Sequence, residues 1–274
     1  MIRISAFADE SSPDPVAQVD VLARHGIRAI EFRAIHGTNV LDLSDAQHAE
    51  FRGLLDDRKF GLSAIGSPIG KMRITEPFAE HLDRFDRAMH LAEFYQAPRI
   101  RVFSFYMPPG EDPASHRDEV LARMAELARR AAARSITLFL ENEKGIYGDT
   151  ASRVADILET INSPALRHAF DPANYVEVRQ PIDEAWARLR SFVSHFHVKD
   201  YDATLERNVP AGAGDGLIPR LLQEAADAGY DGYAVLEPHL TVAGLSSGFT
   251  GPERFAEAAS ALKAILDDRN ISYE

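Results

Sequence analysis

The chain has 274 residues, 45% of them hydrophobic and 26% charged, which is typical of a protein with a sizeable buried core. It contains no cysteine, and this excludes disulfides, iron–sulfur clusters, thiolate zinc sites and cysteine nucleophiles, so any metal must be bound by His, Asp and Glu. The net charge of −12 argues against nucleic acid as the main partner, because a phosphate backbone needs a basic surface.

Short β-like runs alternate with amphipathic stretches along the whole chain. The expected strands cover residues 2–7, 28–33, 60–66, 98–103, 136–141, 166–171, 192–198 and 232–237. The expected helices cover residues 14–25, 45–58, 76–96, 114–134, 149–160, 181–190, 216–228 and 251–269. Eight strand–helix units predict a single α/β domain over residues 1–274, a (β/α)₈ TIM barrel.

An open, doubly wound sheet is the competing fold. It would normally carry a glycine-rich phosphate turn after its first strand, whereas FADESSPDP follows that strand here, so the barrel is favoured. Gly26, Gly61 and Gly229 follow expected helix ends, where a left-handed residue is common. The sequence lacks the pattern of a signal peptide and no run approaches ~18 apolar residues, so we expect a cytoplasmic protein without a membrane partner.

The segment GAGDG (212–216) looks at first like a phosphate loop. It lacks the GK[ST] ending of a P-loop and follows no strand directly, so we interpret it as a tight connection into the seventh helix. Trp186, Phe192 and Phe196 are expected to pack in the fold and not to form a platform for stacking sugars.

Four apolar runs in the second half of the chain each end on a side chain that can bind a metal. These residues are Glu141, Asp171, His197 and Glu237, at the ends of expected strands 5 to 8. In a barrel these ends lie side by side at the mouth that carries the active site. Three carboxylates and one imidazole suit one Mn²⁺ or Mg²⁺ ion, with Zn²⁺, Co²⁺ or Fe²⁺ as alternatives.

The chain resembles the sugar phosphate isomerase/epimerase family, the xylose isomerase-like TIM barrels. The matching segments are LENEKGIYGDT (140–150), FDPANY (170–175), FHVKD (196–200), VPAGAGDG (209–216) and GYDGYAVLEPHL (229–240). The resemblance implies that Glu141, Asp171, His197 and Glu237 hold one divalent cation. It also implies a carbohydrate substrate and an assembly of two or four identical chains.

In the keto-sugar epimerases of that family, the two glutamates also move the proton. A metal on the carbonyl and hydroxyl oxygens stabilises the enediolate that forms when the neighbouring carbon loses its proton. A carboxylate close to that carbon can act as general base. We therefore predict that Glu141 and Glu237 are both metal ligands and the acid/base pair.

Residues near the predicted ligands are candidates for substrate binding. Lys199 shares strand parity with His197 and points to the same side. The full set is Lys199, Glu143, Asn174, His239, Arg33 and Lys71, where Asn174 stands at a position that is His in some family epimerases. Arg33 and Lys71 could instead be surface charges. We expect His195 to fill the barrel, and the direction of Arg101 stays open.

Other functions are compatible with the same residues. A lyase or dehydratase shares the first proton abstraction and then loses a neighbouring group. A nuclease resembling the apurinic-site endonucleases would need further His and Asp ligands for a multi-zinc cluster. A sugar-binding sensor would not need two opposed glutamates. The sequence leaves open whether the substrate carries a phosphate.

Overall fold

The computed structural model describes residues 1–243 and 248–274. Eight parallel strands form a closed barrel in the order β1-β12-β9-β8-β7-β6-β5-β2. The barrel strands are β1 (Arg3–Ala6), β2 (Ala29–Phe32), β5 (Gly61–Ile65), β6 (Arg99–Val102), β7 (Thr137–Glu141), β8 (Leu166–Phe170), β9 (Val193–Val198) and β12 (Tyr233–Leu236). The predicted barrel is therefore confirmed, with all eight strands at the expected places in the chain.

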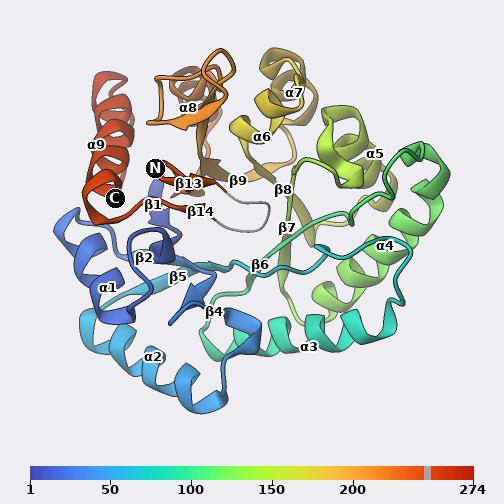
Figure 1. Ribbon diagram of the computed structural model, residues 1–274, viewed down its shortest axis with the longest axis horizontal. Helices are drawn as coiled ribbons and strands as arrows, with labels where there is room; N and C mark the ends of the chain where they lie inside the picture. Colours follow the sequence, from blue (N-terminus) through green and yellow to red (C-terminus); the bar gives the residue numbers. More distant parts are fainter. Residues whose placement is uncertain (244–247) are drawn as a thin grey trace.

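Helices surround these strands on the outside (Figure 1). They are α1 (Pro15–Arg24), α2 (Asp45–Arg58), α3 (Ala79–Phe94), α4 (Arg117–Ala133), α5 (Ala151–Ile161), α6 (Pro172–Glu177), α7 (Ile182–Leu189), α8 (Ile218–Asp227) and α9 (Pro252–Asp268). The eight expected helices are present with ends shifted by a few residues, and α6 is additional. Among the described residues, no helix has the length and apolar character needed to cross a membrane.

The ends of the helices follow local capping chemistry, with one departure from expectation. Gly26 and Gly229 adopt positive φ angles of 68° and 82° after α1 and α8, as predicted. The prediction for Gly61 is wrong, because Lys59 takes the left-handed conformation after α2, with φ 58°. Gly61 instead begins β5. At the other end of α2, Ser44 makes a capping box with Gln47.

Short elements that the sequence pattern does not reveal follow several barrel strands. Three are hairpins: β3 (Ala34–Ile35) with β4 (Thr38–Asn39), β10 (Asp200–Asp202) with β11 (Arg207–Val209), and β13 (Val242–Ala243) with β14 (Gly248–Phe249). Four are 3-10 helices: η1 (Ala8–Glu10), η2 (Val40–Asp42), η3 (Pro113–His116) and η4 (Tyr147–Asp149). The hairpins follow the C-terminal ends of β2, β9 and β12, so they surround the mouth at which the predicted metal ligands lie.

Successive side chains of β9 point alternately toward the surrounding helices and into the barrel. Phe196 faces outward, and its ring lies 5.8 Å from that of Trp186, which also packs against Phe170 at 5.6 Å. His195 and His197, on the opposite face, contact the carboxylate of Glu31 inside the barrel. The predicted packing roles of Trp186 and Phe196 are confirmed, and His195 fills the barrel as expected.

Candidate metal centre

The four predicted ligands converge at the C-terminal end of the barrel. Glu141 ends β7, Asp171 follows β8, His197 lies near the end of β9, and Glu237 follows β12. Each residue offers one ligand atom, and these four atoms all lie within 4.8 Å of one another. None of the four residues is more than 3% exposed. Four strands that are neighbours in the barrel therefore bring these groups to one buried point.

The hydrogen bonding of the four residues is incomplete in a way that fits a cation. Each has one buried atom that makes no hydrogen bond of good geometry in the described part of the chain: Glu141 Oε2, Asp171 Oδ2, His197 Nδ1 and Glu237 Oε2. Two of these atoms have a cationic neighbour, since Asp171 Oδ2 lies 2.7 Å from Nζ of Lys199 and Glu141 Oε2 lies 3.3 Å from Nη1 of Arg101. Buried polar atoms with incomplete hydrogen bonding are costly, so native proteins rarely leave several together. Three oxygens and one imidazole nitrogen match the donors that Mn²⁺, Mg²⁺, Zn²⁺ or Co²⁺ accept. These residues would hold such an ion.

Asp171 is oriented by a helix that the sequence pattern did not reveal. It is the N-cap of α6, and its Oδ1 accepts a hydrogen bond of 3.1 Å from the backbone N–H of Asn174. Pro172 occupies the first helical turn, where its missing N–H costs nothing. Because one carboxylate oxygen is engaged by the cap, the other is directed to the centre. There it lies 2.7 Å from Nζ of Lys199.

His197 is oriented by a carboxylate on its far side. Its Nε2 lies 3.3 Å from Oε2 of Glu31, and the same oxygen lies 2.6 Å from Nε2 of His195. This leaves Nδ1 of His197 facing Glu141 at 3.3 Å and Glu237 at 3.5 Å. A carboxylate behind a ligating imidazole fixes the tautomer and the ring orientation. Glu31 therefore positions His197 for a cation.

Two basic side chains hold Glu237 from one side. Its Oε1 accepts a hydrogen bond of 2.9 Å from Nη1 of Arg33 and lies 3.5 Å from Nε2 of His239. Both partners are themselves anchored, Arg33 by Asp9 at 2.8 Å and His239 by Glu10 at 2.9 Å. With Oε1 engaged, Oε2 of Glu237 faces the ligand cluster.

Glu141 lies between an arginine and an amide. Nη1 of Arg101 is 3.3 Å from Oε2 of Glu141 and 3.7 Å from Oε1 of Glu237. The Asn174 amide lies 3.4 Å from Oε1 of Glu141 and donates at 2.8 Å to the backbone oxygen of Asn142. The direction of Arg101 that the sequence left open is thus into the barrel, between the two glutamates.

These contacts set the charges of the centre. Burial raises the pKa of Asp171 to about 7, although Lys199 opposes the shift. Burial acts in the same direction on Glu141, but His197 and Arg101 outweigh it and hold the pKa of Glu141 below its usual value. Against burial, Lys199 and His239 likewise hold the pKa of Glu237 well below its usual value. The two glutamates are therefore ionised at neutral pH.

Comparison with known proteins identifies the family. The sequence model described as xylose isomerase-like TIM barrel matches residues 19–265. The chain belongs to this family. No curated protein matches the sequence.

Solved structures share the fold of this xylose isomerase-like barrel at low sequence identity. A probable 3-DHS dehydratase, AsbF, from Bacillus anthracis is 16% identical over 96% of this chain and 99% of that chain, with a TM-score of 0.76. A D-tagatose 3-epimerase-like protein is 18% identical over 98% of both chains, with a TM-score of 0.77. A family protein from Mycobacterium smegmatis in complex with magnesium is 18% identical over 99% and 98%, with a TM-score of 0.73. At these identities the likeness shows the fold.

The predicted substrate residues fall into two groups. Lys199, Asn174, His239 and Arg33 each contact at least one of the three carboxylates of the centre. Lys71 and Glu143 lie further out, where Nζ of Lys71 is 3.2 Å from Oε2 of Glu143 and 4.4 Å from the centre of the Phe103 ring. The alternative that Arg33 is a surface charge is wrong, because its side chain is 4% exposed and paired with carboxylates.

Sequence reasoning missed several residues of the centre. Glu31 and Glu10 are fully buried and orient His197 and His239, and the Asn142 amide donates to the backbone oxygen of Asp171 at 2.9 Å. One signal was available for Glu31, which is a carboxylate inside the apolar strand AIEF. A charged residue is rarely buried without a partner, so its position predicts a polar partner inside the barrel.

The GAGDG loop encloses a side chain of its own chain. The Asp200 carboxylate accepts hydrogen bonds from the backbone N–H groups of Gly212 at 2.8 Å, Gly214 at 3.1 Å and Gly216 at 2.9 Å. The loop then leads into α8 at Ile218. This confirms the predicted tight connection. The same hydrogen bonds hold Asp200, the residue after Lys199, in place.

Gly214→Ala should destabilise the fold through this loop. A Cβ at position 214 would lie 2.5 Å from Oδ1 of Asp200 and 2.6 Å from the backbone oxygen of Tyr201. We expect the free energy of unfolding to fall by about 3 kcal/mol, measured by urea denaturation. The control is Gly53→Ala in α2, where nothing lies within 4 Å and the change should stabilise by up to about 1 kcal/mol. Equal effects at both positions would contradict the proposed packing.

Added Mn²⁺ or Mg²⁺ should raise the melting temperature, because the ion would bind only the folded chain. At about 100 times its Kd, an ion adds about 2.7 kcal/mol, which is about 5–10 °C in Tm for a chain of this size. EDTA should reverse the rise, and Asp171→Asn should abolish it. Asp118→Asn is the control, since the Asp118 side chain is 99% exposed. A rise that persists in Asp171→Asn would place the ion elsewhere.

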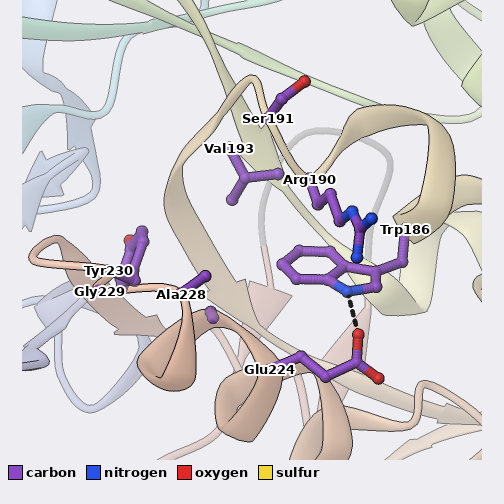
Figure 2. A pocket seen from close by; sticks show the side chains of 9 residues that line it. Trp186, Arg190, Ser191, Val193, Glu224, Ala228, Gly229 and Tyr230 are labelled. Carbon is purple, nitrogen blue, oxygen red and sulfur yellow. Dashed lines mark hydrogen bonds between the residues drawn. The ribbon is translucent and has the colours of Figure 1, made fainter.

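A further pocket lies outside the barrel, away from the four ligands. It has a volume of about 390 Å³ and is lined by residues of α7, α8 and the start of β9, including Trp186, Arg190, Val193 and Glu224 (Figure 2). The Trp186 indole N–H donates to Glu224 at 2.7 Å. None of the four predicted ligands lines this pocket.

Proposed function

We propose that this protein is a divalent-metal-dependent isomerase or epimerase that acts on a sugar, a keto-sugar or a sugar phosphate. The observation that carries the proposal is the buried cluster of Glu141, Asp171, His197 and Glu237, each of which offers one ligand atom within 4.8 Å of the others. The acidic net charge supports a small-molecule substrate over a nucleic acid. The fold shared with proteins named as epimerases and a dehydratase supports an enzyme.

The two glutamates are suited to carry the proton. They flank Nδ1 of His197 at 3.3 and 3.5 Å, and both are ionised, as a proton acceptor must be. A bound cation would withdraw electrons from the substrate's carbonyl and acidify the neighbouring carbon. One glutamate would remove the proton from that carbon. The other, after taking up a proton from solvent, would deliver it to the opposite face, and the first would then release its proton to solvent.

The cationic side chains of the centre would balance charge during this transfer. Arg101 lies between Glu141 and Glu237, and Lys199 lies 2.7 Å from Asp171 and 3.9 Å from Glu237. Negative charge moves from the glutamate to the substrate oxygen as the carbon is deprotonated. Fixed positive groups in a buried site stabilise this charge more than water would.

A lyase or dehydratase acting on a keto-sugar or a sugar-derived acid is the alternative. The observation that favours it is the fold shared with the probable dehydratase at a TM-score of 0.76. The same glutamates would remove the first proton. The buried Lys199 ammonium, 3.9 Å from Glu237, would then donate a proton to a departing hydroxyl group.

Proton NMR in D₂O tests the proposal and separates the two outcomes. The protein is incubated with Mn²⁺ or Mg²⁺ and with D-tagatose, D-fructose 6-phosphate or methyl 3-keto-β-D-glucoside. Exchange of the proton beside the carbonyl with an intact carbon skeleton indicates an isomerase or epimerase, whereas loss of a group indicates a lyase. The absence of metal-dependent exchange with all three compounds would contradict the proposal.

A further inference from the structure

A groove adjoins the metal centre on the side of β2. It has a volume of about 670 Å³, within the ~300–1,000 Å³ typical of small-molecule sites. Its walls come from η1, the β3–β4 hairpin, η2, α3 and β14, and we call it the distal groove. Its lining includes Pro13, Asp42, Pro68, Arg84 and Phe249.

Two residues lie between the distal groove and the metal centre. Asp9 and Arg33 line the groove, and Arg33 also donates to Glu237 at 2.9 Å. A molecule in the groove is thus separated from a metal ligand by a single side chain. The groove is larger than one hexose ring requires, and a substrate that reached from the centre into it would pass Arg33.

The lining of the groove combines apolar and charged side chains. Its apolar residues include Phe249, which has 37% of its surface accessible, together with Pro13 and Pro68. Its charged residues include Arg84 and Asp42, whose Nη1 and Oδ1 atoms pair at 2.9 Å, and both side chains are about half exposed. An apolar wall with a few fixed polar groups is typical of sites for small polar molecules with a ring.

Phe249 is held in place on both sides. A Cβ on Gly248 would lie 1.8 Å from the His239 ring, so β14 packs directly on that ring. The Phe249 backbone oxygen accepts from the Thr241 N–H at 3.0 Å, and the Thr250 N–H donates to the Glu10 backbone oxygen at 2.9 Å. The aromatic ring therefore belongs to a strand that is anchored to the side chains around Glu237.

We propose that the distal groove binds the second ring of a glycoside whose reacting sugar ring lies at the metal centre. The inference rests on the proposed function in placing the reacting ring there. The C–H face of a sugar ring, or an aromatic aglycone, would pack against Phe249. Ring hydroxyl groups would exchange hydrogen bonds with Asp42 and Arg84. The substrate class that follows is a two-ring glycoside and not a free monosaccharide.

Equilibrium binding tests this inference without turnover. Isothermal titration of the Mg²⁺-loaded protein compares methyl β-D-glucoside and methyl α-D-glucoside with cellobiose, trehalose and phenyl β-D-glucoside. We expect at least one two-ring compound to bind at least about tenfold more tightly than either methyl glucoside. Tighter binding of a disaccharide indicates a second sugar ring, and tighter binding of phenyl glucoside alone indicates an aromatic aglycone.

Substitutions test whether the tighter binding of two-ring compounds depends on the groove. Phe249→Ala should reduce it to about threefold or less while the affinity for the methyl glucosides is unchanged. The matched control is Phe94→Ala, because Phe94 is 38% exposed and lies at the end of α3. The inference is overturned if the methyl glucosides bind as tightly as every two-ring compound, if none of the five binds at millimolar concentration, or if Phe249→Ala keeps the preference. If the wild-type protein shows no proton exchange with the keto-sugar probes, the proposed function is overturned, but the preference for a two-ring compound still stands.

Discussion

Replacing Glu141 or Glu237 by glutamine is expected to lower the rate of proton exchange by about 10²–10⁴-fold for each variant. Glutamine keeps the shape of the side chain, but its amide cannot accept a proton from carbon. It also removes one negative charge from the group of atoms that lies within 4.8 Å at the barrel mouth. The rate is measured by NMR in D₂O with the probe that wild-type protein turns over.

The controls for this prediction separate proton transfer from metal binding. Glu50→Gln, at an exposed position in α2, should leave the rate unchanged. The rise in Tm on adding Mn²⁺ should be measured for each variant, because a glutamine that abolishes the rise has removed the ion as well as the base. Near-normal exchange in both the Glu141→Gln and the Glu237→Gln protein would contradict the assigned roles.

Arg101→Met should destabilise the folded protein by about 3–5 kcal/mol, because it leaves buried carboxylates without their cation. The arginine is 3% exposed and lies 3.3 Å from Glu141, 3.7 Å from Glu237 and 4.0 Å from Glu31. Methionine fills a similar volume, so the loss reflects charge more than packing. Urea denaturation without added metal measures the effect.

A matched substitution on the surface shows whether burial is the cause. Arg188 pairs with Glu159 at 3.3 Å, and both side chains are about half exposed. Arg188→Met should cost less than about 1 kcal/mol, since solvent screens an exposed ion pair. Added Mn²⁺ should recover part of the stability of the Arg101→Met protein, because the ion would supply positive charge next to Glu141 and Glu237. Equal losses in the two variants would show that Arg101 does not neutralise the centre.

The fold could be predicted well because its signals are local. Each barrel strand is a short apolar run between helix-ending and helix-starting residues, and the eight strands occur at the expected positions. The hairpins around the mouth were missed because their strands have only two or three residues, which is too short to show an alternation of period two. Helix α6 was missed for a similar reason, although Asp171-Pro172 is a recognisable helix start.

The clustering of the four candidate ligands was predictable because their position follows from chain order. Residues at the C-terminal ends of parallel strands must lie at one end of a barrel, so Glu141, Asp171, His197 and Glu237 could be grouped without coordinates. The same rule does not apply to Arg101 and Glu31, which lie within their strands and not at the ends. Whether such a side chain points inward depends on the register and stagger of the closed barrel.

By itself, the sequence determined the barrel, the four candidate ligands and the end of the barrel at which they meet. Only the tertiary structure decided which charges surround them: Arg33 and His239 on Glu237, Arg101 between the glutamates, Glu31 behind His197 and Lys199 on Asp171. The physical reason is distance along the chain. Residue types and strand ends can be recognised from a short stretch of sequence. Arg33, in contrast, lies 204 residues from Glu237 and comes within 2.9 Å of it only when the barrel closes.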